Sequence, residues 1–236
     1  MNDTGPTVTT EAQPLFAKVC AFCFPGGEEA ARRVLAIRTT QRGEMRMSPQ
    51  AKWIPFTSEE VTHATRSNFR WDARIKTGAF TSLTATDAFE EGRGRLVVKV
   101  AGAIPVNKLE GPDLDKGELQ RYLSSIAFCP PILLNHASLE IASDGPLTLR
   151  LRNRQDSTEA ILDIDVSGEG QPLTCRADRP RMLGKKALLT PWSGIVAGYQ
   201  EWNGLRVATR LEVSWHLPEG QFTYYRGEIL SFSLVS

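Results

Sequence analysis

The chain has 236 residues, with 28 lysines and arginines against 27 aspartates and glutamates. Because these charges nearly cancel, no overall field favours nucleic acid or a membrane surface as a partner. The four cysteines are too few and too scattered for a disulfide scaffold. No stretch of the sequence approaches the roughly 18 consecutive apolar residues of a transmembrane helix.

The N-terminal segment is polar and has no basic stretch followed by an apolar one, so we expect no signal peptide and a cytoplasmic protein. Its small polar residues predict a disordered tail over residues 1–11, followed by a single β-rich domain over residues 12–236. The apolar run over residues 14–24 predicts a short buried helix, which the two glycines that follow would end.

The next part of the chain is expected to form strands. Residues 32–47 predict a long strand, in which Gly43 marks a bulge or the close approach of another segment. Residues 69–75 alternate apolar and polar side chains with a period of two, which is typical of a strand with one buried face. Further strands are expected over residues 80–89 and, after a glycine turn, from residue 95 onward.

Residues 113–128 predict the one well-marked helix of the chain. Asp115 is expected to cap it, because Glu118 follows three residues later at the spacing of a capping box. A single apolar stripe recurs at helical spacing, and it consists of Leu119, Tyr122, Leu123 and Ile126. A helix of about a dozen residues is marginal alone in water, so we expect it to lie against the strands.

Strands resume after this helix. Residues 147–152 and 162–166 each alternate apolar with charged or polar side chains. Asn203-Gly204 is a strong signal for a two-residue hairpin turn. The clearest strand of the chain is expected over residues 207–217, where the alternation is longest.

The pattern predicts one fold class. Roughly ten strands joined mostly by short turns favour antiparallel neighbours. Their one-sided apolar faces predict a sheet with water on one side, and a sheet of this size tends to curl. The fold is therefore expected to be mainly β (α+β): a large curved antiparallel sheet or half-open β-barrel, with the 113–128 helix packed on its concave face.

Several short motifs carry a family resemblance. They include W-x-P-F at residues 53–56, E-x-x-R-Y-L at residues 118–123 followed by C-P-P-I-L-L, and the hairpin sequence G-Y-Q-E-W-N-G-L-R-V at residues 198–207. Over most of residues 14–232 the chain resembles a bacterial family known as domain of unknown function 6544 (DUF6544), which implies no activity. The order of strands and helix also resembles the lipoprotein-carrier (LolA/LolB-like) half-barrel, which holds acyl chains, although the expected absence of a signal peptide argues against a periplasmic carrier.

The sequence offers few residues for chemistry. Cys20-x-x-Cys23 has the spacing of a redox or half-zinc motif, but it lies within an apolar helix-like run, and buried cysteines are more often small apolar side chains. His63, His136 and His216 are far apart, and none has a nucleophile in a recognisable motif. We therefore predict no catalytic residue, no cofactor and no metal site.

Two features of the sequence, a pair of aspartates and a basic stretch, carry charge that could serve a site. Asp163 and Asp165 share a strand face and could pair as carboxylates, although alternation favours a solvated face. The only local excess of positive charge lies in residues 176–186, where the basic residues are Arg176, Arg179, Arg181, Lys185 and Lys186. This stretch could hold a phosphate or carboxylate, but a solvated loop or charged sheet edge is the commoner case, and the aromatics of a single-stranded nucleic-acid site are missing.

The tryptophans lie in or beside predicted strands, where core packing is the safer interpretation for any one of them. A concave sheet that one helix does not cover completely would nevertheless leave an apolar pocket. An arginine beside the helix stripe must pair with a buried acid or an anionic ligand, because an unpaired buried charge is costly. The candidate pocket residues are Trp53, Trp71, Arg121, Tyr122, Trp192, Trp215 and Tyr224.

The leading hypothesis is a non-enzymatic protein that binds an apolar small molecule, such as a lipid or acyl chain, in the concave cavity. An enzyme built from dispersed Arg, His and Asp residues stays open, and convergent polar groups with shifted pKa values in a deep cleft would favour it. A structural or protein-interaction module is the third possibility, favoured by a filled concave side and an apolar outer patch. The sequence determines neither the ligand nor the oligomeric state.

Overall fold

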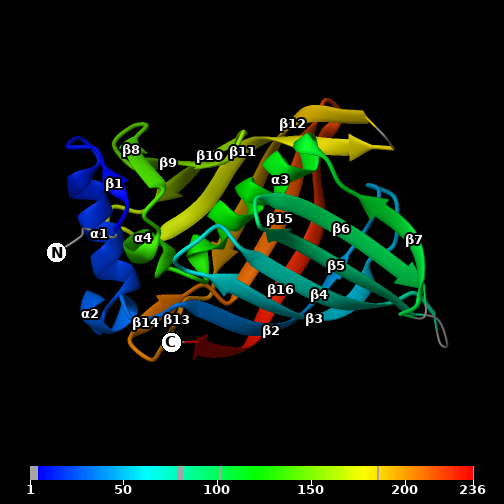
Figure 1. Cartoon of the computed structure of the whole chain (residues 1–236), viewed down its shortest axis with the longest axis horizontal. Helices are drawn as coiled ribbons and strands as arrows, with labels where there is room; N and C mark the ends of the chain where they lie inside the picture. Colours follow the sequence, from blue (N-terminus) through cyan, green and yellow to red (C-terminus); the bar gives the residue numbers. More distant parts are fainter. Residues whose placement is uncertain (1–4, 79–81, 101, 185, 236) are drawn as a thin grey trace.

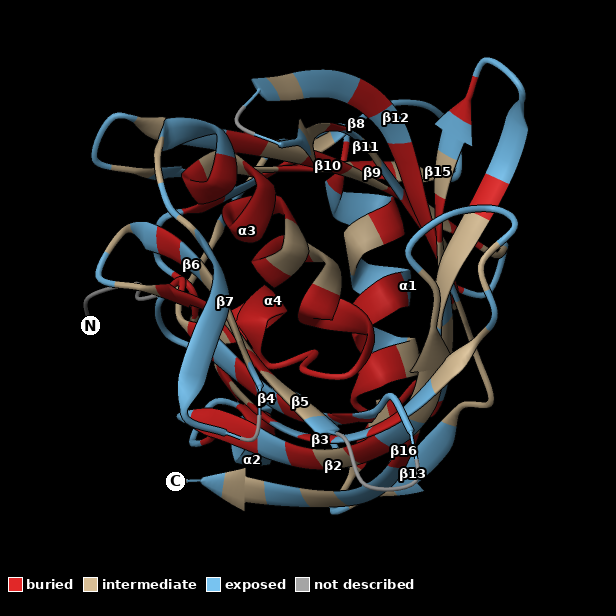
Figure 2. Ribbon diagram, turned by 90° about the vertical axis from the view of Figure 1, so that its right-hand side faces the viewer, coloured by how far each residue is buried: buried red, intermediate tan, exposed pale blue. Residues whose placement is uncertain are grey.

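The computed structural model describes residues 5–78, 82–100, 102–184 and 186–235. Over these residues a single 14-stranded sheet curves around helix α3 (Pro112–Ser124). Figure 2 views the molecule from the right-hand side of Figure 1 and shows α3, mostly buried, enclosed by strands. The predicted fold class, mainly β with a helix on the concave face of a large curved sheet, is confirmed.

The strands of this sheet, in their spatial order, are β1 (Thr7–Val8), β8 (Leu139–Ser143), β9 (Thr148–Gln155), β10 (Thr158–Val166), β11 (Pro172–Leu183), β12 (Lys186–Ala197), β15 (Arg210–Leu217), β16 (Gly220–Val235), β2 (Ala36–Met45), β3 (Ile54–His63), β4 (Phe69–Lys76), β5 (Ser82–Glu90), β6 (Arg93–Val100) and β7 (Ile104–Leu109). Two further strands, β13 (Gln200–Trp202) and β14 (Leu205–Val207), form a separate hairpin. The remaining helical segments are α1 (Gln13–Cys23), α2 (Glu28–Ala31), a 3₁₀ turn (Ser125–Ala127) and α4 (Ile132–Asn135).

The sheet is antiparallel except at one edge. There β1 pairs in parallel with β8, with Thr7 opposite Glu140. The predicted disordered tail over residues 1–11 therefore does not extend to β1, because its backbone gains hydrogen-bond partners from a strand more than a hundred residues away. The first four residues of that predicted tail lie outside the described residues.

Helix α3 bridges the two arms of the curved sheet. It packs against β5 and β6 on one side and against β10 and β11 on the other. The predicted apolar stripe is buried as expected, with Leu119, Tyr122 and Leu123 fully buried and Ile126 nearly so. A sheet that curls this far leaves a gap between its arms, and the helix fills that gap with its apolar side.

The predicted role of Asp115 as the helix cap is wrong. The helix begins earlier, with Pro112 in its first turn and Gly111 at the cap position, and no side chain caps it. Asp115 lies one turn inside and accepts a hydrogen bond from the Gly94 amide of β6 at 2.7 Å. A Cβ at residue 94 would lie 2.8 Å from the Leu114 carbonyl oxygen, so glycine is what allows this strand to approach the helix.

Some predicted strand boundaries also change. The start of the expected 32–47 strand lies before β2 and follows the short helix α2. Gly43 shows no bulge, since its register with both neighbours is continuous, but an added Cβ there would overlap the Arg226 carbonyl, so the expected close approach is confirmed. Residues 80 and 81 of the expected 80–89 strand lie outside the described residues.

The expected strand over residues 207–217 is interrupted. The Ala208 amide donates to the Ala127 carbonyl and the Thr209 amide to the Ala197 carbonyl, so the chain leaves one hairpin and joins the main sheet at this point. The predicted turn at Asn203-Gly204 is confirmed, because both residues have positive φ and join β13 directly to β14. The sequence does not reveal such a break, because its residue types keep alternating although Val207, Ala208 and Thr209 are all buried in the structure.

The two ends of the molecule differ. Helices α1, α2 and α4 gather at one end, at the left of Figure 1. The predicted helix over residues 14–24 is present there as α1, which buries Leu15, Val19, Cys20 and Cys23. Among the residues that the structure describes, the opposite end carries strand ends and no helix, so the concave side faces outward there; we call it the open end.

Candidate functional site

Three strands place an acidic, an aromatic and a second acidic side chain in one row on the concave face. Glu60 of β3 and Asp87 of β5 both lie directly opposite Trp71 of β4, and residues directly opposite one another share a face of a sheet. Arg121 reaches this row from α3. Its Nη1 donates to Asp87 Oδ2 at 2.5 Å, and its Nη2 lies 3.6 Å from Glu60 Oε2.

The surroundings of Arg121 explain how a charge is tolerated here. Its guanidinium stacks 4.4 Å from the centre of the Phe69 ring and 5.5 Å from that of Trp71. The side chain of Arg121 is 21% exposed, against 3% for Glu60. Of the two alternatives expected for Arg121, a buried acid or an anionic ligand, the structure shows the first: Arg121 pairs with the buried Glu60 and with the half-buried Asp87.

A second ion pair joins α3 to the opposite arm of the sheet. Arg179 of β11 has its Nη2 3.7 Å from Glu118 Oε1 and donates to the Gly117 carbonyl oxygen at 2.7 Å. Its guanidinium lies 4.7 Å from the centre of the Trp192 ring. Gln120 adds hydrogen bonds from its Nε2 to carbonyl oxygens of β10 and β11. The polar residues of α3 therefore tie both arms of the sheet together.

Glu118 and Asp87 form a carboxyl pair between the two arginines. The Glu118 Oε2 and Asp87 Oδ1 atoms are buried and have no hydrogen-bond donor among the described side chains. Burial, with the nearby negative charge of Asp87, raises the pKa of Glu118 to about 8. At neutral pH Glu118 therefore keeps its proton and is a neutral acid beside Asp87.

An aromatic wall leads from this charged cluster toward the open end. The Trp192 Nε1 donates to the Tyr224 hydroxyl at 3.1 Å, and Trp215 stacks on Tyr224 with ring centres 5.9 Å apart. Trp192 is buried, whereas Trp215 and Tyr224 are half-buried. These three rings therefore form a continuous row from the buried arginine of the cluster to partly exposed side chains.

The other candidate pocket residues lie in different settings. Trp53 is half-buried beneath the guanidinium groups of Arg46 and Arg226, at 4.6 and 4.7 Å from its ring centre. Tyr122 is fully buried in the core, and its hydroxyl donates to the His63 carbonyl at 2.9 Å. A pocket bounded by all seven predicted residues stays a prediction.

Two hollows of the surface lie away from the aromatic wall. One, of about 540 Å³, lies on the outer side of the arm formed by β2 to β6 and includes the polar residues Thr57, Asp72, Thr84 and Lys99. The other, of about 500 Å³, lies beside the start of α3 and includes Glu90, Arg93, Glu110 and Asp115. Both are open and most of the residues around them are polar or charged, so neither matches the expected apolar cavity.

With this geometry in view, comparison with known proteins identifies a family. A family model described as "Family of unknown function (DUF6920)" matches residues 16–233. The chain belongs to the DUF6920 family. The resemblance to DUF6544 was therefore wrong as a family assignment: the short motifs fit the order of elements but did not separate one family from another. No curated protein matches this DUF6920 chain.

Three solved structures are similar to this chain at low sequence identity. A DUF1329 family protein from Desulfovibrio piger is 10% identical with a TM-score of 0.53, covering 96% of this chain and 94% of that one. A LolA superfamily protein from Nitrosomonas europaea is 9% identical with a TM-score of 0.48, covering 97% and 95%. An outer membrane lipoprotein-sorting protein domain, described as putative, from Vibrio parahaemolyticus is 8% identical with a TM-score of 0.47, covering 93% of each chain. The likeness to the DUF1329 protein shows a common fold.

The paired cysteines of the DUF6920 chain are buried within α1. Burial raises the pKa of Cys20 to about 12 and raises that of Cys23 as well, so both thiols stay protonated at neutral pH. A metal or redox site needs the thiolate. Within the described parts of the chain, no group of His, Cys, Asp and Glu side chains is arranged to hold a metal ion.

The three histidines do not converge. The Ser67 hydroxyl donates to Asn153 Oδ1 at 3.0 Å, so the His136 Nε2, 3.0 Å from the same hydroxyl oxygen, must donate to it. In that arrangement His136 cannot take the Ser67 proton, and burial lowers the pKa of His136 to about 4. His216 bonds Ser193 at 2.8 Å and is itself exposed.

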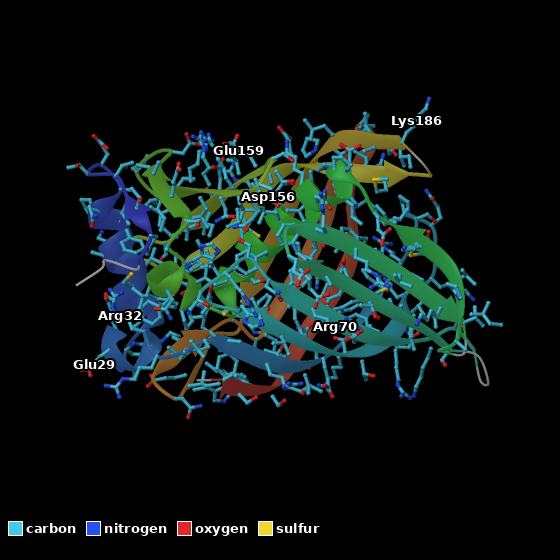
Figure 3. All side chains as sticks on the ribbon, in the orientation of Figure 1. Glu29, Arg32, Arg70, Asp156, Glu159 and Lys186 are labelled. Carbon is cyan, nitrogen blue, oxygen red and sulfur yellow. The ribbon has the colours of Figure 1, made fainter. Side chains whose placement is uncertain are left out.

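The two aspartates of β10 in the DUF6920 chain, Asp163 and Asp165, face outward and pair with arginines. Asp163 accepts from Arg150 at 2.8 Å, and Asp165 accepts two bonds from Arg176, each 2.7 Å long. These arginines are 38% and 51% exposed, which confirms the interpretation of a solvated face. Glu159 continues this face at the outer edge of the molecule in Figure 3.

The basic stretch over residues 176–186 is the β11–β12 hairpin rather than a loop. Arg176 faces outward, whereas Arg179, three positions along, faces inward to Glu118. Lys185 lies outside the described residues. Grouping these residues by charge alone missed Arg179, and the odd spacing between the two arginines was the signal that could have separated them.

Proposed function

We propose that this DUF6920 protein binds an apolar or amphipathic small molecule, such as a lipid or acyl chain, against the aromatic part of its concave face. One observation carries the proposal. Helix α3 packs on β5, β6, β10 and β11. The apolar side chains on the concave faces of neighbouring strands remain only half-buried, and they include Met45, Ile54, Val213, Trp215, Tyr224 and Tyr225.

Such a surface suits a ligand with an apolar chain. Half-buried aromatic rings gathered on a concave face lose contact with water when an apolar group covers them, at roughly 25 cal/mol for each Å² removed from water. Arg121, Glu118 and Arg179 at the inner end supply the few polar groups that fix the orientation of a ligand.

An enzyme is a second candidate because of the carboxyl pair. Glu118 has a raised pKa beside Asp87, and unequal carboxyls of this kind act as acid and base in catalysis. Against this, both acids pair with arginines, and the described side chains place no nucleophile beside them. Recovery of the bound molecule after long incubation separates the two: a binding protein returns it unchanged.

The test uses a fluorescent fatty acid and one matched pair of variants. Val213 lies on the concave face of β15 opposite Gly194 and Tyr225, whereas Ile195, next to Gly194 in β12, points outward and is 48% exposed. Val213→Lys is expected to weaken binding at least about tenfold, because an apolar ligand would strip water from the new ammonium group. Ile195→Lys makes a similar change on the outer face and should leave the affinity unchanged.

Native mass spectrometry of gently purified protein supplies the independent readout. An apolar molecule should accompany the wild type and the Ile195→Lys variant, with thermal unfolding confirming that both variants fold. Equal binding by both lysine variants, or no binding of any apolar probe by the wild type, would contradict the proposal.

The proposal includes a small-molecule partner rather than nucleic acid, and a cytoplasmic location. Within the described residues, no helix has both the length and the apolar character to span a bilayer. Fractionation of cells that express the protein checks the location.

A further inference from the structure

The two arginines of the cluster, the half-buried Arg121 and the buried Arg179, differ in their counter-ions. Arg121 contacts both Asp87 and Glu60. Among the described residues the only acid in ion-pair contact with Arg179 is Glu118, at 3.7 Å. Glu118 keeps its proton at neutral pH, so the positive charge of Arg179 lacks an ionised partner of its own.

Arg179 also has an unused hydrogen-bond donor. Its Nη2 is occupied by the Gly117 carbonyl oxygen, but its Nε is buried and has no partner. Only 8% of the side chain is exposed. A buried guanidinium with a free donor and no facing anion is in an unfavourable state unless something else supplies the negative charge.

The aromatic wall begins at this arginine. The Arg179 guanidinium stacks on Trp192, Trp192 bonds the Tyr224 hydroxyl, and Trp215 stacks on Tyr224 on the side of the open end. A molecule with its polar end at Arg179 would therefore have an apolar chain against two further rings.

We propose that Arg179 binds the carboxylate of a long-chain acid whose apolar chain lies along Trp192, Tyr224 and Trp215. The inference rests on the proposed function and names its ligand class. A single negative charge fits better than a doubly charged phosphate, because Asp87 and Glu60 already face Arg121 and leave one cation, Arg179, without an ionised partner. The planar guanidinium also matches the geometry of a carboxylate.

The experiment compares four probes of equal chain length: a fatty acid, its methyl ester, the corresponding alcohol and the alkyl phosphate. At pH 7 the wild type is expected to bind the acid at least about tenfold more tightly than the alcohol or ester, since hydrogen bonds to charged groups are the strong ones. Arg179→Gln should lose this preference and still bind the alcohol. Arg176→Gln, on the outer face of the same strand, should keep the preference.

A pH series supplies a second test that does not depend on the folding of the Arg179 variant. Glu118 faces Asp87, Arg121 and Arg179, with Glu60 and Tyr224 beyond them. As pH rises through about 8, ionised Glu118 should take Arg179 as its partner, so the wild type should lose its preference for the acid. Glu118→Gln cannot ionise and should keep the preference at pH 9.

The outcomes separate this inference from the proposed function. If acid, ester and alcohol bind the wild type equally, the inference fails and the proposed function stands. If none of the four probes binds, the proposed function itself fails. Tighter binding of the phosphate than of the acid, an unchanged preference in Arg179→Gln, or a wild-type preference that persists above pH 8 would each overturn the inference.

Discussion

The inner and outer faces of the same strands use ion pairs in different ways. On the outer face, Arg150 and Arg176 pair with Asp163 and Asp165 while remaining substantially exposed. On the inner face, the Arg179–Glu118 pair is 8% exposed on both sides. Exposed pairs contribute about 0–1 kcal/mol, whereas removing one partner of a buried pair costs about 3–5 kcal/mol. The residue types are the same, so burial rather than composition makes the inner cluster the place to look for function.

Removing the Arg121 charge should give the largest effect. Arg121→Met would leave Asp87 and Glu60 buried without their cation, and we expect a loss of about 3–5 kcal/mol in the free energy of unfolding. Arg150→Met, in the outer group, should cost no more than about 1 kcal/mol. Urea unfolding of both variants measures the difference, and equal losses would remove the distinction between the two faces.

The free energy of unfolding should depend on pH in the way expected for a Glu118 that is protonated in the folded protein. Its pKa is about 8 in the folded protein and 4.5 when unperturbed, so folding favours the protonated form. This contribution is complete below pH 4.5. It is lost as pH rises to about 8, and between these two pH values the free energy of unfolding should fall by about 1.4 kcal/mol per pH unit. Glu118→Gln should remove that decline.

Urea unfolding at several values between pH 5 and 8.5 checks this. The free energy of unfolding of Glu118→Gln should increase steadily relative to that of the wild type as pH rises. Parallel curves for the two proteins would show that Glu118 does not hold a proton at neutral pH.

His136 should give a smaller effect of opposite sign. It is a buried group near α4, away from the ion pairs, and burial holds its pKa at about 4, below the usual 6.5. The stability that depends on neutral His136 is present above pH 6.5 and is lost as pH falls toward 4. His136→Gln should flatten this acid limb in unfolding curves measured between pH 4 and 7. If the variant loses stability in acid as the wild type does, groups other than His136 cause that loss.

Local patterns predicted much of the fold. The apolar stripe along α3 and the 3₁₀ turn that follows it was identified correctly, because its four residues recur at helical spacing. The period of two in the sequence of β4 predicted which face of that strand is buried. Asn203-Gly204 predicted the hairpin of β13 and β14. The break at Ala208 was missed because it depends on backbone hydrogen bonds to residues far along the chain.

The candidate site was predicted only in part. Arg121 was expected to pair with a buried acid or an anionic ligand, because it lies beside an apolar stripe, but the acids that it contacts were not identified. Glu60 and Asp87 come from strands separated by β4, and they meet only because the register places both opposite Trp71. Arg179 was grouped with its basic neighbours, although its inward direction gives it a different role.

The sequence by itself determined the strands, the central helix and the face that this helix buries, because side-chain periodicity is a local property of the chain. Only the tertiary structure decided which charges meet inside the sheet. Register and curvature bring Glu60, Asp87, Glu118, Arg121 and Arg179 together from four separate elements. Burial then shifts the proton of Glu118, since the cost of a charge depends on the surroundings that folding creates.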